Sequence, residues 1–434
     1  MEEAQRQAAQ VVRRVLDGAT LPAALAAVAP EEAADVGRRR SLVQELAYGT
    51  LRHWGTLDAL TKRLAAKPFS DPVLATLVAV ALYQLSHTRA PEFAVVDRAV
   101  AAAASLVRPA AKSLVNALLR RYLRERDTLE AAVRDDPVAR FSYPRWWIQR
   151  VHREYPDDWQ AILDAGNARP PLALRVNSLV TTRELYLADC GDAGVGARAA
   201  GAAGVIVEPA KPVQQLPGYA DGAFAVQDLG AQCAAPLLDL AAGQRVLDAC
   251  AAPGGKTAHI AETHGIELVA LDNDELRIAR VRENLARLRA AGPNVRVMVG
   301  DAAAPAQWWD GRAFDRILAD VPCTASGIVR RHPDGKWLRR ESDIAAFART
   351  QWRILDALWS VLAPNGRLLY VTCSVFGAEN DEQIDAFVAR HGDALRETLT
   401  FPADAVHRGG QLLPSPPGAG HNQDGFFYAR LRKV

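Results

Sequence analysis

The cysteines are the side chains with the greatest chemical potential in this sequence. Five are present: Cys190, Cys233, Cys250, Cys323 and Cys373. They form no C-x-x-C pair and no metal-ligand spacing with histidine, which argues against a zinc site and a disulfide framework. One cysteine in an apolar strand is usually an inert core residue. Two stand where strands should end, in Asp320-Val-Pro-Cys323 and Thr-Cys373-Ser, and this placement favours a pair of reactive thiols, because a thiolate is a strong nucleophile.

A glycine-rich loop follows another apolar run, in the string Asp248-Ala-Cys-Ala-Ala-Pro-Gly-Gly-Lys-Thr257. Two glycines let the backbone approach a ligand, and a helix amino terminus favours negative charge. A P-loop would need glycine where Cys250 stands, and the fingerprint G-x-G-x-x-G is absent. The string therefore indicates a ligand loop of another kind, with a structural turn as the alternative.

Acidic residues end three successive apolar runs, at Asp248, Asp272 and Asp301. A single such acid is more often a helix N-cap than a ligand contact. Three in register predict a row of acceptors along one crevice, and a carboxylate at the end of the second strand commonly accepts the hydroxyls of a bound ribose. An adenosine cofactor held without a phosphate grip is indicated, which favours S-adenosylmethionine over ATP or NAD.

These residues require a mostly parallel sheet, since ligands of such sheets bind beyond the carboxyl ends of the strands. We predict strands at residues 245–249, 267–272, 295–300, 314–319 and 367–372, and helices at residues 257–262, 274–290 and 344–362. Strands that alternate with helices form a sheet covered on both faces. Residues 425–432 are predicted to add an antiparallel edge strand.

The chain divides into three predicted parts: an all-helical domain at 1–140, a small α+β connector at 141–222 and a catalytic α/β domain at 223–434. The first part is poor in glycine and carries 20 basic against 16 acidic side chains, a net of +4. Its arginine runs, at residues 38–40 and 120–124, form either a solvated helix face or an RNA-facing patch. An aromatic cluster opens the connector.

Composition excludes several classes of protein. The 434 residues are 49% hydrophobic and 24% charged, which rules out a disordered chain, a collagen and a disulfide-stapled miniprotein. With 52 basic and 50 acidic residues, the chain has no large overall positive charge that would indicate a polyanionic partner. A nucleic acid would therefore have to bind local basic patches. The amino terminus lacks the pattern of a secretory signal, and the longest apolar run, residues 73–83, is too short to span a bilayer. We expect a soluble cytoplasmic protein.

The motifs resemble those of a known family. The loop string, Asp272, Asp301, Asp320-Val-Pro-Cys323, Tyr-Val-Thr-Cys373-Ser and Asp424-Gly-Phe-Phe-Tyr-Ala together resemble the Sun group of RNA 5-methylcytosine methyltransferases. Two amino-terminal strings, Glu45-Leu-Ala-Tyr-Gly-Thr-Leu-Arg52 and Lys112-Ser-Leu-Val-Asn-Ala-Leu-Leu-Arg-Arg121, are similar to a NusB-like RNA-binding domain. The connector string from Arg169 to Asn177 fits the same group. The resemblance covers nearly the whole chain.

The resemblance implies a Rossmann-like methyltransferase domain that uses S-adenosylmethionine to methylate carbon 5 of a cytosine in RNA. By the family pattern, Cys373 attacks carbon 6 of the base, Cys323 assists release of the product, and Asp320 hydrogen-bonds the cytosine near ring nitrogen 3. Asp272 takes the ribose hydroxyls and Asp301 the adenine amino group. The implied cofactor-binding residues are Cys250, Ala251, Ala252, Pro253, Gly254, Gly255, Lys256, Asp272, Asp301 and Asp320. We also expect the charge of Lys256 to lower the pKa of a neighbouring thiol.

The implied substrate is 16S rRNA that is unassembled or partly assembled. The implied enzyme is a monomer that uses no metal and binds no membrane. A base must leave its stack before chemistry, so a loop or a flipped nucleotide is expected. We predict that the basic segment at residues 330–340 contacts phosphates. Two alternatives remain: a DNA cytosine methyltransferase with Cys323 as nucleophile, and a non-catalytic RNA-binding assembly factor.

Overall fold

The computed structural model describes residues 1–28, 36–65, 67–416 and 421–434. Contacts within the chain group them into two compact units: residues 1–167 with 329–340, and residues 168–328 with 341–434. This grouping differs from the predicted three-part division, because residues 141–167 cluster with the helices and residues 168–222 with the large sheet.

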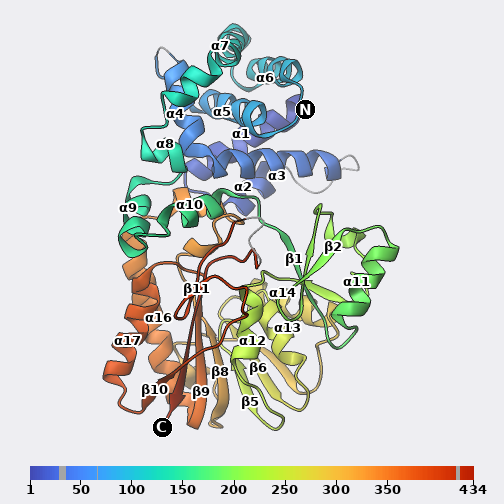
Figure 1. Cartoon of the computed structure of the whole chain (residues 1–434), viewed down its shortest axis with the longest axis vertical. Helices are drawn as coiled ribbons and strands as arrows, with labels where there is room; N and C mark the ends of the chain where they lie inside the picture. The colour runs from blue at the N-terminus through green and yellow to red at the C-terminus, as the bar shows by residue number, and fades with distance from the viewer. Residues whose placement is uncertain (29–35, 66, 417–420) are drawn as a thin grey trace. The chain divides into compact units, whose positions relative to one another are not determined.

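The first unit is all-helical, as predicted (Figure 1). Helix α5 is its most deeply buried helix, and residues 77–82 of this helix are fully shielded from solvent. It begins where Asp71 caps the Val73 amide and Pro72 occupies the first turn. The helices are α1 (Glu2–Leu16), α2 (Leu21–Val28), α3 (Val36–Arg52), α4 (Trp54–Leu64), α5 (Pro72–His87), α6 (Glu92–Leu106), α7 (Ala111–Ala131), α8 (Pro137–Phe141), α9 (Arg145–Glu154), α10 (Trp159–Asn167) and α15 (Gly335–Leu338).

The aromatic cluster that opens the predicted connector packs inside this helical unit. Tyr143 and Trp147 are each 1% exposed, and their rings lie 5.7 Å apart. The Thr56 hydroxyl donates to the Ala139 carbonyl, and its oxygen lies 3.0 Å from that of Ser142. Burial of large aromatic surface against the helices explains why the unit extends beyond residue 140.

The basic segment at residues 330–340 is also part of the helical unit. Its predicted contact with phosphates stays a prediction for Arg331, Arg339 and Arg340, which are partly or fully exposed. Arg330 and Lys336 are both 0% exposed. Lys336 donates to the Arg52 carbonyl at 2.7 Å, and the Trp337 indole donates to the Leu51 carbonyl at 2.8 Å. These side chains satisfy buried carbonyls, and the two fully buried cations cannot also contact solvent-exposed phosphates. Of the arginine run at 38–40, the side chain of Arg38 lies outside the described residues.

The second unit contains a small antiparallel sheet, of order β2-β3-β1-β4, beside one helix. Arg175, at 0% exposure, anchors this sheet: it pairs with Glu262 and donates to Gln227 at 2.7 Å. Asn177 donates to the carbonyls of Gly222 and Leu288 at 2.8 and 2.7 Å. The elements are β1 (Leu172–Val176), α11 (Arg183–Asp192), β2 (Ala197–Ala200), β3 (Gly204–Val207) and β4 (Phe224–Val226).

The large sheet has the predicted mostly parallel centre. Its strand order is β11-β12-β13-β9-β8-β5-β6-β7, with β10 also paired to β13, and the five strands from β9 to β7 are parallel. The strands are β5 (Arg245–Asp248), β6 (Glu267–Asp272), β7 (Val295–Val299), β8 (Phe314–Asp320), β9 (Leu362–Thr372), β10 (Ala394–Glu397), β11 (His407–Arg408), β12 (Gln411–Leu412) and β13 (Phe426–Lys433). The helices are α12 (Ala234–Leu237), α13 (Gly255–Ala261), α14 (Glu275–Arg287), α16 (Glu341–Val361) and α17 (Asp381–Arg390).

Helices cover both faces of this sheet (Figure 1). Alternate strand residues point to opposite sides: Leu247 and Ile317 pack with α16, whereas Val246 and Leu318 pack with α12 and α13. This double covering explains why the central strands are apolar runs without a polar alternation.

The last strand, β13, was predicted at the sheet edge, and this is wrong. It pairs with β9 on one side and with β12 and β10 on the other. Phe427, Tyr428 and Leu431 are all fully buried, so packed residues cover both faces of the strand. Neighbouring strands pair with both of its edges. No helix in the described ranges is long and apolar enough to cross a membrane.

Candidate active site

The direction of the chain reverses beside β5, and this places the site. From β5 the chain proceeds outward through β6 and β7, and then returns to build β8 and β9 on the other side of β5. At such a switch point the loops that leave the carboxyl ends of neighbouring strands diverge and open a crevice. The loops after β5 and β8 are those that carry the Pro-Gly-Gly-Lys and Asp-Val-Pro-Cys motifs.

The loop after β5 turns into α13 at Gly254. This glycine has φ of +101° at the helix N-cap, and a Cβ there would press on the Val281 backbone of α14. A left-handed conformation with a close neighbour requires glycine. Thr257, in the first turn of α13, donates to Asp248 at 2.7 Å and so ties the helix back to the strand.

Asp272 braces the loop from the end of β6. Its carboxylate accepts the Ala252 amide at 3.1 Å and pairs with Arg277 at 3.2 Å. Arg277 also donates to the Ala252 carbonyl at 3.2 Å. Asp272 is 3% exposed and each of its oxygens can accept a further hydrogen bond, so it can position the loop and still receive hydroxyl donors.

Asp248 lies below the loop and is 1% exposed. One of its oxygens has no hydrogen-bond partner within the described part of the chain, and the other accepts from Thr257. Burial raises the pKa of this carboxyl to about 7, and the nearby charge of Asp320 adds to the rise. An orphaned buried acceptor marks a place where the site lacks a donor or a positive charge.

The two cysteines that follow β8 and β9 meet. The Sγ atoms of Cys323 and Cys373 are 3.3 Å apart, although 50 residues separate them in the chain. The two strands are parallel neighbours, with Asp320 opposite Val371, so both thiols arrive at the same edge. Cys323 is buried and Cys373 is partly open. The hydrogen bond with Cys373 and burial together raise the pKa of the Cys323 thiol well above its usual value.

The remaining cysteine of the loops, Cys250, is not a comparable nucleophile. Burial and the carboxylates of Asp320 and Asp248 raise the pKa of its thiol well above the usual value. For Cys250 and Cys323 the shift is therefore opposite to the one expected from the charge of Lys256. Lys256 is instead committed to Asp320, which accepts from its Nζ at 2.7 Å. Burial lowers the pKa of Lys256, but its ion pair with Asp320 and the charge of Cys373 outweigh this effect and raise it.

A buried carboxylate that sequence reasoning missed fixes the two cysteine loops to each other. Glu379 is 0% exposed. It accepts the Thr324 amide at 2.9 Å, the Thr324 hydroxyl at 2.5 Å, the Ser374 hydroxyl at 2.6 Å and the Gln351 amide at 3.1 Å. Thr324 follows Cys323 and Ser374 follows Cys373, so one side chain holds both loops. The sequence held one signal of this arrangement: small polar residues stand beside the two cysteines, and the apolar pattern of the strands does not explain them.

Two glycines let a third segment close on these loops. The Gly327 amide donates to the Cys373 carbonyl at 2.8 Å, and the Gly425 amide donates to the Gly327 carbonyl at 2.9 Å. A Cβ on Gly327 would clash with the Gly425 carbonyl. The Asp424-Gly string therefore serves backbone packing behind the thiols.

The thiols and the acids line one cavity of about 420 Å³, a volume typical of small-molecule sites. Of the predicted site residues, the cavity is lined by Cys250, Ala252, Asp272, Asp301, Asp320, Cys323 and Cys373. Other predicted residues do not line it: Ala251, Pro253, Gly254, Gly255 and Lys256. Sequence reasoning missed several lining residues: Ala249, Asn273, Arg277, Gly300, Ala302, Ala303, Val321, Pro322, Thr350, Arg353 and Ile354.

Family models match three successive segments. Residues 235–432 match the family described as 16S rRNA methyltransferase RsmB/F, residues 143–214 match its ferredoxin-like domain, and residues 2–124 match the NusB family. A Pseudomonas putida protein named ribosomal RNA small subunit methyltransferase B is 44% identical over 98% of both chains. A Vibrio cholerae protein of the same name is 43% identical over 95% of this chain and 92% of its own.

The chain belongs to the RsmB/F methyltransferase family. The family match confirms the predicted resemblance and the NusB-like nature of the helical domain. The boundaries of the matched segments do not test the predicted domain limits, which stay a prediction.

Solved structures share the fold of this family member. The crystal structure of PH0851 superposes with a TM-score of 0.80 at 24% identity, over 100% of this chain and 99% of the other. A methyltransferase homologue from Pyrococcus horikoshii superposes with a TM-score of 0.58 at 26% identity, over 68% of this chain and 97% of its own. The overlap with the first structure shows a shared fold along the length of this chain.

Proposed function

We propose that this family member methylates carbon 5 of a cytosine in 16S rRNA, with S-adenosylmethionine as methyl donor and Cys373 as covalent catalyst. The observation that carries the proposal is the cysteine pair, 3.3 Å apart, in a cavity lined by acids at the ends of parallel strands. An inert core would not bring two thiols into a polar cavity.

The donor set of the cavity fits S-adenosylmethionine. This cofactor offers ribose hydroxyls, an adenine amino group and an ammonium group, and the cavity offers carboxylates: Asp272 and Asp301 in its wall and the orphaned oxygen of Asp248 beneath the loop. Asp272 would hold the ribose and Asp301 the adenine amino group, while the loop at residues 250–256 would enclose the amino-acid part. When bound, the cofactor supplies an electrophilic methyl group.

Cys373 would activate the base, because carbon 5 of cytosine is a weak nucleophile. Its thiolate forms a bond to carbon 6, and the electron pair of the 5,6 double bond becomes available at carbon 5. Negative charge develops on the ring at N3, which takes up a proton from water, and the Asp320 carboxylate then accepts a hydrogen bond from the resulting N3–H group. Lys256, at 2.7 Å from Asp320, gives this carboxylate a fixed counter-charge and orients it.

Cys323 would act after methyl transfer. The new carbon 5 still carries a proton, and release needs that proton to leave while the bond between carbon 6 and Cys373 breaks. The hydrogen bond with Cys373 is the first cause of the high pKa of Cys323. Once Cys373 is bonded to carbon, its negative charge is gone and this cause disappears. Cys323, once it has lost its own proton to solvent, would accept the carbon 5 proton; the electron pair of that C–H bond restores the 5,6 double bond, and the carbon 6–sulfur bond breaks and returns its electron pair to Cys373.

The substrate follows from the chemistry and from the relatives. Attack on carbon 6 requires the cytosine outside its stack, in a loop or flipped from a helix. The relatives are named as small-subunit rRNA methyltransferases, and free or partly assembled 16S rRNA offers such bases. One chain contains every group that the proposed reaction uses, so a monomer suffices.

Trapping of the covalent adduct tests the proposal. Purified variants are incubated with 16S rRNA and S-adenosylmethionine, and protein bound to RNA is resolved on a denaturing gel. We expect Cys323→Ala to accumulate the adduct and Cys373→Ala to abolish both the adduct and methyl transfer. Cys190→Ala, a buried cysteine outside the cavity, is the matched control.

Two outcomes would contradict the proposal. Accumulation with Cys373→Ala and loss with Cys323→Ala would make Cys323 the nucleophile, as in the DNA-enzyme alternative. Absence of methyl transfer from labelled S-adenosylmethionine by the unmodified protein would favour the non-catalytic assembly factor. Bisulfite mapping of the methylated rRNA then locates the modified cytosine.

A further inference from the structure

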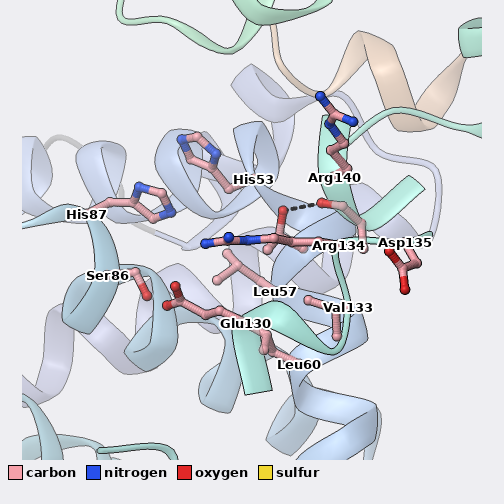
Figure 2. A pocket seen from close by; sticks show the side chains of 12 residues that line it. His53, Leu57, Leu60, Ser86, His87, Glu130, Val133, Arg134, Asp135 and Arg140 are labelled. Atoms are coloured by element: carbon pink, nitrogen blue, oxygen red, sulfur yellow. Dashed lines mark hydrogen bonds between the residues drawn. The ribbon is translucent and has the colours of Figure 1, made fainter. Parts of the chain in front are cut away.

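Two neighbouring hollows open on the helical unit, and neither is lined by a group used in the proposed reaction. The first has a volume of about 610 Å³ and the second of about 440 Å³. Both are lined by Arg134, Asp135 and Arg140, so these residues form a shared rim. Figure 2 shows the first hollow, with Arg134 extending across it.

The first hollow contains a platform of stacked rings. The imidazoles of His53 and His87 lie 4.0 Å apart with an angle of 9° between their planes, and Tyr83 stacks on His87 at 5.5 Å. His53 is largely buried beneath, while His87 is exposed at the end of α5. Burial lowers the pKa of the His53 imidazole to about 2, so this ring is neutral at physiological pH. Planar imidazole rings that line a hollow can stack an aromatic base.

The second hollow has its own aromatic wall. Trp159 lies between Phe141 and His152, with ring centroids 5.0 and 4.8 Å away. Trp159 and the exposed His152 both line the hollow. Each hollow therefore offers an aromatic surface, and the two surfaces stand on either side of the arginine rim.

The rim carries two exposed arginines, and the charge of Arg140 also acts on the nearby carboxyl of Asp164, whose pKa burial raises and Arg140 lowers. Among the described residues, neither Arg134 nor Arg140 forms an ion pair, and both are exposed. Arg140 stacks over the Phe141 ring at 4.8 Å, which orients its guanidinium. Asp135 reduces the local positive charge but has no side-chain partner of its own. A guanidinium pair held beside open aromatic surfaces suits an anion that joins two planar groups.

Polar groups inside the first hollow add selectivity. Glu130 accepts from the Tyr122 hydroxyl at 2.6 Å through one oxygen, and the Tyr122 and Ser86 hydroxyl oxygens lie 2.7 Å apart. The second carboxylate oxygen of Glu130 remains available to accept from a ligand. In Figure 2, Glu130 and Ser86 lie on the same side of the hollow, below the two imidazoles. An acceptor at the edge of a stacking platform selects a base that carries an amino or imino donor.

We propose that these two hollows bind two successive unpaired nucleotides of single-stranded RNA, one base in each, with the phosphate between them on Arg134 and Arg140. Stacked bases and a neutralised backbone phosphate are the two contacts by which proteins hold single strands. A duplex keeps its bases stacked on each other and cannot fill both hollows. The inference deepens the proposed function, since it places part of the rRNA substrate on the helical unit.

Binding of a short RNA to the full chain tests this inference. The probe is a single strand of about ten nucleotides that contains 4-thiouridine, within the usual span of a single-strand site. We expect Arg134→Gln with Arg140→Gln to weaken binding and to reduce the slope of log affinity against log salt by about 0.7 to 1.4, for one or two lost phosphate contacts. We expect His87→Ala to weaken binding by about 5- to 150-fold, the range for loss of one stacked base.

Matched controls separate a local site from general charge. Arg14→Gln with Arg63→Gln removes two exposed arginines of the same unit that line neither hollow, and we expect no change in affinity. Photocrosslinks should map by mass spectrometry to the peptides that contain His87 and Trp159. Thermal unfolding confirms that the exposed substitutions leave the fold intact.

The outcomes distinguish this inference from the proposed function. Equal affinity for single strand and duplex, equal loss in the control pair, or crosslinks only elsewhere would overturn the nucleotide site. Loss of methyl transfer in every assay, with the predicted binding pattern intact, would overturn the proposed reaction and leave the nucleotide site standing. If both hold, the rim variants raise KM for rRNA and leave kcat unchanged.

Discussion

Removal of the Glu379 carboxylate should disturb catalysis through the two cysteine loops. The side chain accepts four hydrogen bonds from residues that follow Cys323 and Cys373 and from α16. We consider Glu379→Ala and Glu379→Gln. The first leaves four donors without their acceptor, and the second keeps the shape and one carbonyl oxygen.

The magnitude follows from which donors can find another partner. The Thr324, Ser326 and Ser374 hydroxyls lie within 3.2 Å of one another, and Gln351 also donates to the Pro322 carbonyl at 3.0 Å. The Thr324 amide has no such alternative, and an orphaned buried donor costs about 1 to 3 kcal/mol. The other three donors find only weaker hydrogen bonds, so we expect Glu379→Ala to lower the free energy of unfolding by about 2 to 4 kcal/mol in total. Glu379→Gln should cost about 1 kcal/mol, since its amide nitrogen can face hydroxyl oxygens that are able to accept.

Catalysis should fall more than stability. A displacement of reacting groups by about 1 Å costs about 100-fold in rate, so we expect kcat of Glu379→Ala to fall by about that factor at a temperature where the protein is folded. KM for S-adenosylmethionine should stay nearly constant, because the hydrogen bonds that the Glu379 carboxylate accepts within the described chain come from Thr324, Gln351 and Ser374 and not from the loop at 250–256. The assays are urea unfolding and transfer of labelled methyl groups to 16S rRNA, with exposed Glu382→Gln as control. Unchanged kcat in a fully folded Glu379→Ala would refute the claim that this carboxylate positions the thiols.

Two further changes test the structure behind the site. The pKa of Asp248 is raised from 3.8 to about 7, so the wild type should be most stable below pH 4 with respect to this group and lose stability as pH rises toward 7, by about 4 kcal/mol for a shift of about 3 units. Asp248→Asn should flatten that loss in urea unfolding between pH 4 and 7; an unchanged pH profile would contradict the assigned pKa. Gly327→Ala should lower the free energy of unfolding by about 1 to 3 kcal/mol and reduce adduct formation, because its Cβ meets the Gly425 carbonyl, whereas Gly392→Ala has open space and should do neither.

Much of the sheet was predictable because its signal is local. Apolar runs that each end in an acid or a cysteine predicted β5 to β9 within a few residues, and parallel order then brought their carboxyl ends together. The meeting of Cys323 and Cys373 follows from the pairing of neighbouring strands. For these residues the positions along the chain were sufficient for the prediction, because the parallel direction of the strands then determines which strand ends meet.

Features that depend on tertiary packing were not predictable in the same way. The basic segment around Lys336 has the composition of a surface loop, yet the buried Lys336 donates to a carbonyl inside the helical unit. The place of β13 inside the sheet depended on whether β10 and β12 would pair with its free side. No local sequence pattern encodes that pairing. Glu379 ends the short turn just before α17, where an acid is ordinary for the helix dipole, and only the folded chain shows its four partners.

The burial of Glu379 is better explained by position than by stability. Burial raises the pKa of its carboxyl, which means that the fold resists its charge. A well-packed apolar residue in such a place is often as stable as a buried polar network or more so. An apolar side chain, however, could not specify the distance between two loops that are 50 residues apart in the chain, whereas four directional hydrogen bonds can. The same argument applies to Gly327 and Gly425, because the close approach of their backbones fixes the position of the segment behind Cys373. Catalytic loss from substitutions at these three residues should therefore exceed what their effect on unfolding accounts for, and this disproportion is the measurable signature of a site held in place by its surroundings.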